Sequence, residues 1–139
     1  MVHALREAHR VLKVEGLLID LRPAPKHRRV GIVASGTWHS VGRMHEDFED
    51  DVAANRAVTR VLAEGLFSRM SQREFDVDRV VDTPDEFRGW LEDSVTRGTL
   101  PRHEWLMELV ERAWGEMAKG SRIAIRGPLM LAVYRKVAA

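Results

Sequence analysis

The chain lacks cysteine and carries almost no net charge. Without cysteine it can form no disulfide, no thiolate metal site and no cysteine nucleophile. Its 22 basic and 21 acidic side chains leave a formal net charge of +1, so no global field draws it to nucleic acid or to a membrane surface. These absences exclude several function classes, and they favour a reducing, cytoplasmic location.

Long apolar runs are also missing. No stretch approaches the roughly 18 apolar residues of a transmembrane helix, and the first residues form a charged amphipathic pattern rather than a secretory signal peptide. Hydrophobic residues at 45% and charged residues at 31% are ordinary for a soluble globular protein. A length of 139 residues predicts one domain over residues 1–139, which would bury about 68% of its unfolded surface.

The segment 4–23, ALREAHRVLKVEGLLIDLRP, predicts a helix, a glycine turn and a buried strand. Gly16 can adopt the left-handed conformation that ends a helix. Residues 17–21 are a nearly continuous apolar run, which is typical of a strand covered on both faces in a parallel sheet. The apolar residues before them recur at helical spacing on one face, namely Ala4, Leu5, Ala8, Val11 and Leu12. The pattern indicates an α/β protein.

This segment closely resembles a part of the class I S-adenosylmethionine-dependent methyltransferases. In that family a helix carrying L-x-E-x-x-R-V-L-K-P-G-G leads into the fifth strand of the sheet. Val14 and Glu15 stand where the family usually has Pro-Gly, so we expect a looser turn here. The resemblance implies that the half of the fold that holds the cofactor is absent from residues 1–139.

The next segment predicts an inserted hairpin and a helix. Two alternating runs, 30–34 and 37–41, flank a Ser-Gly pair and predict a β-hairpin. A helix is expected from about residue 47 to residue 64, because its first turn is acidic and Gly65 is placed to end it.

One strand and two helices are expected after that. Residues 73–82 alternate and predict a half-exposed strand. Thr83, Pro84 and Glu86 form the signature of a capped helix start. A further helix is expected over residues 101–119, with Gly120 at its end.

The carboxyl end resembles the same family. Residues 122–126 alternate, Gly127-Pro128 breaks the pattern, and residues 129–136 form a more apolar strand. This looks like the family's closing antiparallel hairpin, its sixth and seventh strands. The D-T-P-D-E-F helix start is similar to that of small-molecule methyltransferases of the type that includes the trans-aconitate enzymes. The resemblance implies an α/β, partial Rossmann-like methyltransferase fold: helix, buried strand, inserted hairpin, helices and closing antiparallel hairpin.

The residues that would hold the family's cofactor are missing. The family holds S-adenosylmethionine on a G-x-G-x-G turn and binds its ribose with an acidic residue after the second strand. This chain contains no G-x-G, and its nearest glycines, such as Gly31 and Gly36, lie five positions apart. No strand before Leu17 can supply the acidic residue. We therefore expect no catalytic residues, no cofactor and no appreciable S-adenosylmethionine binding in this chain alone.

Two polar clusters are weaker candidates for a site. His39, His45, Glu46 and Asp47 match no recognised ligand spacing, so we expect a solvated loop and no metal site. The basic loop 26–29 follows a strand whose loop faces the substrate in the family, although a solvated loop is the favoured alternative. It lacks the interleaved aromatic residues of a nucleic-acid platform. The candidate substrate-binding residues are Arg28, Arg29, Trp38, His39 and Arg43.

The strand 17–21 also predicts an assembly surface. In a complete family member it lies between the fourth and seventh strands, so without the fourth strand one row of its backbone groups has no partner. Such an apolar edge is an association site. The simplest closed arrangement pairs it antiparallel with the same strand of a second copy. We expect a homodimer centred on residues 1–23, with candidate interface residues Leu5, His9, Leu12, Leu17, Ile19 and Leu21.

The leading hypothesis is a methyltransferase-like protein that is not catalytic alone and acts by assembly, either with itself or with a complementary methyltransferase half. A second hypothesis is a subunit of a small-molecule methyltransferase that another chain completes. A third is a small-anion-binding protein, and a product of a truncated reading frame without a role is the remaining alternative.

Overall fold

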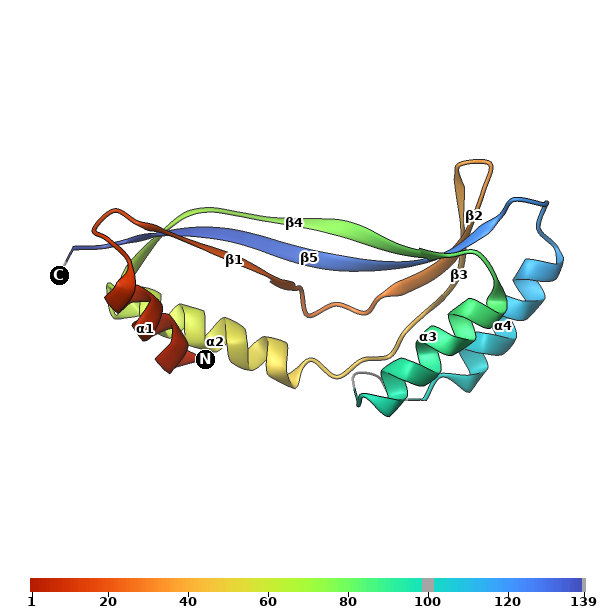
Figure 1. The fold of residues 1–139 in the computed structure, drawn as a ribbon, viewed down its shortest axis with the longest axis horizontal. Helices are drawn as coiled ribbons and strands as arrows, with labels where there is room; N and C mark the ends of the chain where they lie inside the picture. Colours follow the sequence, from red (N-terminus) through yellow and green to blue (C-terminus); the bar gives the residue numbers. More distant parts are fainter. Residues whose placement is uncertain (99–101, 139) are drawn as a thin grey trace. The chain divides into compact units, whose positions relative to one another are not determined.

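The computed structural model describes residues 1–98 and 102–138. Across those residues, four helices accompany a mostly antiparallel sheet of five strands in a mixed α/β arrangement (Figure 1). The elements in chain order are α1 (Val2–Val11), β1 (Leu17–Pro23), β2 (Arg29–Ala34), β3 (Thr37–Arg43), α2 (Glu49–Ala63), β4 (Phe67–Val81), α3 (Pro84–Thr96), α4 (Glu104–Gly115) and β5 (Arg122–Lys136).

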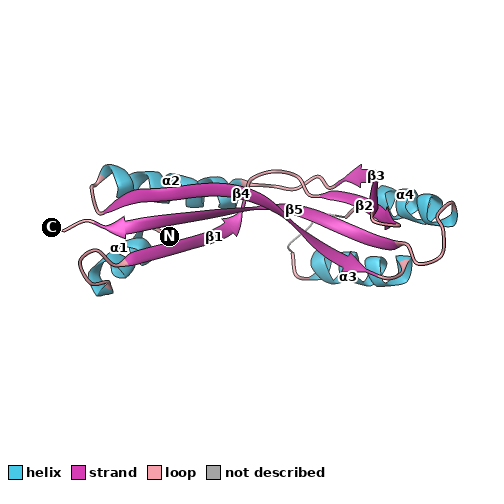
Figure 2. Cartoon of the chain, turned by 90° about the horizontal axis from the view of Figure 1, so that it is seen from above, coloured by secondary structure: helices cyan, strands magenta, loops and turns pink. Residues whose placement is uncertain are grey.

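Strand β5 is the central strand of the sheet (Figure 2). Strand β1 runs antiparallel to the second half of β5, from Leu17 opposite Arg135 to Pro23 opposite Leu129. Strand β2 runs antiparallel to the first half of β5, and β3 pairs with β2. Strand β4 also pairs with β5. Three of the other four strands, β1, β2 and β4, therefore pair with the last strand of the chain.

The chain forms two compact units, each with its own hydrophobic core. Unit 1 consists of Met1–Pro25, Asp47–Phe75 and Pro128–Ala139, and unit 2 consists of Lys26–Glu46 and Asp76–Gly127. In unit 1, α1 and α2 cover one face of the sheet (Figure 1). The buried residues there are Leu5, Ala57, Val58, Val61, Phe67, Ala132 and Tyr134. The prediction of a single domain over residues 1–139 stays a prediction.

The core of unit 2 lies between its helices α3 and α4 and its part of the sheet. Phe87 is fully buried and stacks on Trp90, with their ring centroids 5.9 Å apart. The other buried members come from β2, the loop after β3, α3, α4 and β5: Val30, Ile32, Met44, Leu91, Leu106, Met107, Val110, Ile123 and Ile125.

Strand β1 is covered on one face only, which corrects the prediction of a strand buried on both faces. Leu17, Ile19 and Leu21 are 52%, 67% and 56% exposed, and they alternate with half-buried residues that face the helices. The predicted parallel sheet would have required cover on both faces, whereas an antiparallel sheet can leave one face to solvent.

The predicted closing hairpin is wrong as well, because residues 122–136 form one continuous strand. Pro128 has no backbone N–H, which normally excludes proline from a central strand. The residues that pair with β2 end at Arg126, and those that pair with β1 begin at Leu129. Pro128 therefore lies where β5 changes neighbours, and no ladder hydrogen bond is lost on that side.

The first helix ends earlier than its apolar pattern predicts. It stops at Val11, and the left-handed conformation falls on Glu15, with φ of 64°, rather than on Gly16. Gly65, in contrast, has φ of 74° directly after α2, as predicted for a helix-ending glycine. The predicted helix 101–119 is shorter, Glu104–Gly115, and residue 101 lies outside the described residues.

Two further predictions that rest on local turn chemistry are confirmed. Ser35 and Gly36 both have positive φ, 51° and 76°, and join β2 to β3 in the predicted hairpin. The Thr83 hydroxyl accepts a hydrogen bond from the backbone N–H of Glu86 at 3.2 Å, as expected for the capped start of α3. Strand β4 extends the predicted strand 73–82 back to Phe67.

Candidate functional site

The edge strand of unit 1 is the first candidate surface. Within residues 1–98 and 102–138, β1 pairs with β5 and with no other strand, so the outer row of its backbone N–H and C=O groups has no partner strand. Edge strands are usually protected by charged side chains, proline or a covering element. In β1 the two charged residues, Asp20 and Arg22, pair with each other and are only 10% and 15% exposed.

An apolar patch lies beside that edge. Ile19 stands opposite Val133 and Leu21 opposite Leu131, so these side chains share the face of the sheet that the helices leave open. We call Leu17, Ile19, Leu21, Leu131 and Val133 the apolar patch. A contiguous apolar patch on a sheet face marks an interaction surface more often than a scattered exposed leucine does.

The structure places the predicted interface residues before β1 elsewhere. Leu5 is buried, and Leu12 packs against the same core of unit 1. The His9 ring meets Phe67 edge-on at 5.4 Å and forms a 3.3 Å hydrogen bond with the Val137 carbonyl. These three side chains make their contacts within unit 1. Leu17, Ile19 and Leu21, in contrast, lie together on its exposed face.

Two of the three arginines of the predicted substrate site, Arg28 and Arg29, already have carboxylate partners. The Arg28 guanidinium donates to Glu46 at 2.7 Å and lies over the Trp90 ring at 5.5 Å. Arg29 pairs with Asp76 at 2.6 Å. Both positive charges are therefore compensated inside unit 2, which reduces the attraction of this loop for an anion.

The other three predicted substrate residues lie on β3. Trp38 is half-buried beneath Arg126, whose guanidinium carbon is 4.2 Å from the ring centroid. His39 and Arg43 are exposed. Successive side chains of a strand point to opposite faces, so Trp38 and His39 cannot line one site. The five predicted residues do not converge.

A row of ion pairs crosses one face of unit 2, and the sequence analysis did not identify it. Asp78 pairs with Arg126 at 2.7 Å, and Asp82 pairs with Arg122. The Arg126 guanidinium holds the pKa of Asp78 below its usual range. The pair therefore adds stability above the ordinary carboxylate pKa and loses it as pH falls through the lowered value. The alternating aspartates of β4 were the sequence feature from which these ion pairs could have been predicted.

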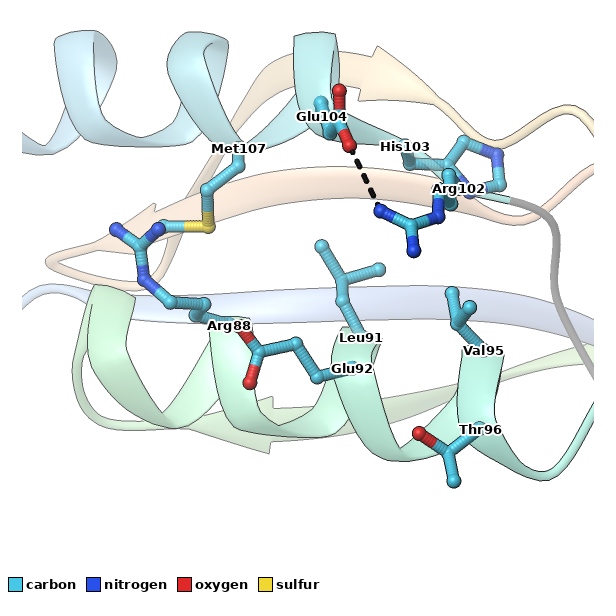
Figure 3. Close-up of a pocket in the computed structure, with 9 residues that line it drawn as sticks. All are labelled: Arg88, Leu91, Glu92, Val95, Thr96, Arg102, His103, Glu104 and Met107. Atoms are coloured by element: carbon cyan, nitrogen blue, oxygen red, sulfur yellow. Dashed lines mark hydrogen bonds and ion pairs between the residues drawn. The ribbon is translucent and has the colours of Figure 1, made fainter.

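A cavity of about 260 Å³ lies between α3 and α4 (Figure 3). Figure 3 shows Leu91 and Val95 pointing from α3 towards α4, and Arg102 paired with Glu104. His103 is buried, and its Nε2 accepts a hydrogen bond from the backbone N–H of His45 at 3.0 Å. The charged lining residues are balanced in number, with Arg88 and Arg102 against Glu92 and Glu104.

Over residues 1–98 and 102–138, no three His, Cys, Asp or Glu side chains gather as metal ligands. None of the helices in that part of the chain is long and apolar enough to span a bilayer.

Comparisons with protein-family models, with curated proteins and with solved structures find no match to this chain. The resemblance to class I methyltransferases thus rests on the segments quoted above.

Proposed function

We propose that the chain is a methyltransferase-like protein that is not catalytic alone and acts by assembly, through β1, with a second copy of itself. The observation that carries the proposal is the open edge of β1 beside the apolar patch of unit 1. The unpaired backbone N–H and C=O groups of an edge strand are satisfied when another strand pairs there.

The strand order of unit 1 supports the methyltransferase-like part of the proposal. The strand expected to be the family's fifth, β1, lies antiparallel to residues 129–135, which were expected to be its seventh. The place of the sixth strand, beside the seventh, is taken by β4 instead of residues 122–126. In this interpretation, unit 2 holds the segments inserted after the fifth strand and before the seventh.

The alternation of β1 limits how two copies can pair. Odd-numbered residues face solvent and even-numbered residues face the helices. Directly opposite residues in an antiparallel pair point to the same face. Odd positions must therefore pair with odd positions, which a two-fold axis perpendicular to the sheet achieves. The two apolar patches then become continuous, and the helices of both copies lie on the other face.

Sedimentation equilibrium tests the assembly. We expect the chain to sediment as a dimer at micromolar concentration, and Ile19→Pro and Ile19→Lys to sediment as monomers, because each blocks edge pairing. Val77→Lys is the matched control, since Val77 is 44% exposed on β4 in unit 2, and it should remain dimeric. A folded wild-type chain that stays monomeric at high micromolar concentration would contradict the proposal.

The second candidate, an enzyme completed by another chain, is favoured by the same open edge of β1. Residues 1–139 contain no G-x-G turn, so any cofactor cradle must come from another polypeptide segment. Calorimetric titration of the chain with S-adenosylmethionine should give no binding heat. Micromolar binding at one site per chain would show that these residues hold the cofactor and that the non-catalytic assignment is wrong.

A further inference from the structure

A polar cavity at the surface of unit 1 has no role in the assembly proposed above. Its volume is about 210 Å³, and it lies between α2 and the helix-facing side of β1, β4 and β5. That volume is about seven times the 30 Å³ that one water molecule occupies in the liquid, so it fits a ligand of a few heavy atoms. Its lining residues are Arg22, Asn55, Val58, Thr59, Arg69, Gln72, Met130 and Tyr134.

Arg22 lines this cavity, and one of its guanidinium donors is unsatisfied. Its Nε donates to both carboxylate oxygens of Asp20, at 2.7 and 3.0 Å. Its Nη2, in contrast, is buried and has no hydrogen-bond partner. Leaving a buried N–H donor of a charged group without a hydrogen bond costs free energy. Such donors in folded proteins therefore normally have an acceptor.

A second guanidinium lines the same cavity. Among the described residues, no ion pair joins Arg69 to a carboxylate, and its positive charge acts on the pKa of the neighbouring Tyr134 hydroxyl. Because Asp20 compensates Arg22, the charge of Arg69 leaves the cavity with one net positive charge. Burial, followed by the Asp20 charge, raises the pKa of Tyr134, so its hydroxyl keeps its proton at neutral pH.

We propose that this cavity binds a small monocarboxylate, which would accept from the free Nη2 of Arg22 and pair with the guanidinium of Arg69. One negative charge matches the one uncompensated positive charge, and planar carboxylates suit the forked donors of arginine. The Tyr134 hydroxyl and the side chains of Asn55 and Gln72 offer further polar contacts. The cavity is too small for a nucleotide-sized cofactor.

NMR titration of the full chain tests this assignment, with acetate as the carboxylate, inorganic phosphate as the competing oxyanion, and chloride at matched ionic strength as the blank. We expect saturable shifts of the Arg22 and Arg69 side-chain N–H signals with acetate, at lower concentrations than with phosphate. Tighter saturation by phosphate, or shifts that only follow ionic strength, would overturn the carboxylate assignment.

Two variants locate the binding. Arg69→Gln should weaken acetate binding at least tenfold, and the exposed position of Arg69 makes the change tolerable for folding. Arg73→Gln is the matched control on the same strand, because Arg73 lies over Phe75 and outside the cavity. Equal acetate affinity in Arg69→Gln and wild type would refute the proposal, as would saturable shifts confined to Arg28 and Arg43. Neither result bears on the dimer.

Discussion

Phe87→Ala should destabilise unit 2 by about 3–5 kcal/mol, the range for truncating a fully buried phenylalanine. The side chain is completely buried, lies in the core formed by both helices and the sheet, and stacks on Trp90. Truncation removes its burial and leaves a cavity that the surrounding strands can fill only partly. Urea unfolding, followed by amide-hydrogen exchange of α3, measures the loss.

Phe75→Ala is the control for this change. Phe75 is 36% exposed on β4 in unit 1, so its truncation should cost less than about 1.5 kcal/mol, since little burial is lost. Equal losses for the two variants would contradict the placement of Phe87 at the centre of the unit 2 core.

Gly31→Ala should cost about 1–3 kcal/mol, the range for overpacking a well-packed site. A Cβ at this position would lie 2.5 Å from two atoms of the Trp38 ring and 2.8 Å from the His39 carbonyl oxygen. The ring must therefore move, and it would lose its contact with the Arg126 guanidinium. Unfolding experiments give the stability change, and the indole N–H shift of Trp38 reports the displacement.

Gly89→Ala is the matched control, and its expected effect on stability has the opposite sign. Gly89 lies within α3, and a Cβ there would meet no atom within 4 Å. Alanine in a helix interior is favoured over glycine by roughly 0.5–1 kcal/mol, so this variant should be more stable than wild type. A destabilised Gly89→Ala together with a neutral Gly31→Ala would contradict the packing of unit 2.

The parts of the fold that short-range chemistry determines were predictable. The Ser35-Gly36 hairpin, the Thr83 cap and the Gly65 helix end each depend on residues within four positions of one another. In each of these cases the sequence carries the physical cause in one place.

Features that depend on distant segments were not predictable. The continuity of β5 through Gly127-Pro128 depends on where β2 and β1 end against it. An apolar run cannot reveal whether one or both faces are covered, so the exposure of Leu17 and Ile19 was missed. The cavity of unit 1 joins Arg22, Arg69 and Tyr134, which no motif or spacing connects.

Single-cysteine cross-linking tests the central claim, assembly through β1, most directly. The chain has no cysteine, so a thiol introduced at Leu17, Ile19 or Leu21 can form a disulfide only between copies. In a two-fold antiparallel pair, one of these positions lies opposite the same position of the second copy, or two of the three positions lie opposite each other across the two copies. Either arrangement brings two introduced thiols within disulfide distance. We predict that one variant, or one equimolar mixture of two, forms a covalent dimer under mild oxidation, whereas a cysteine at the exposed Val137 does not. Failure of all three positions and their mixtures to cross-link above the level of the Val137 control would contradict the account.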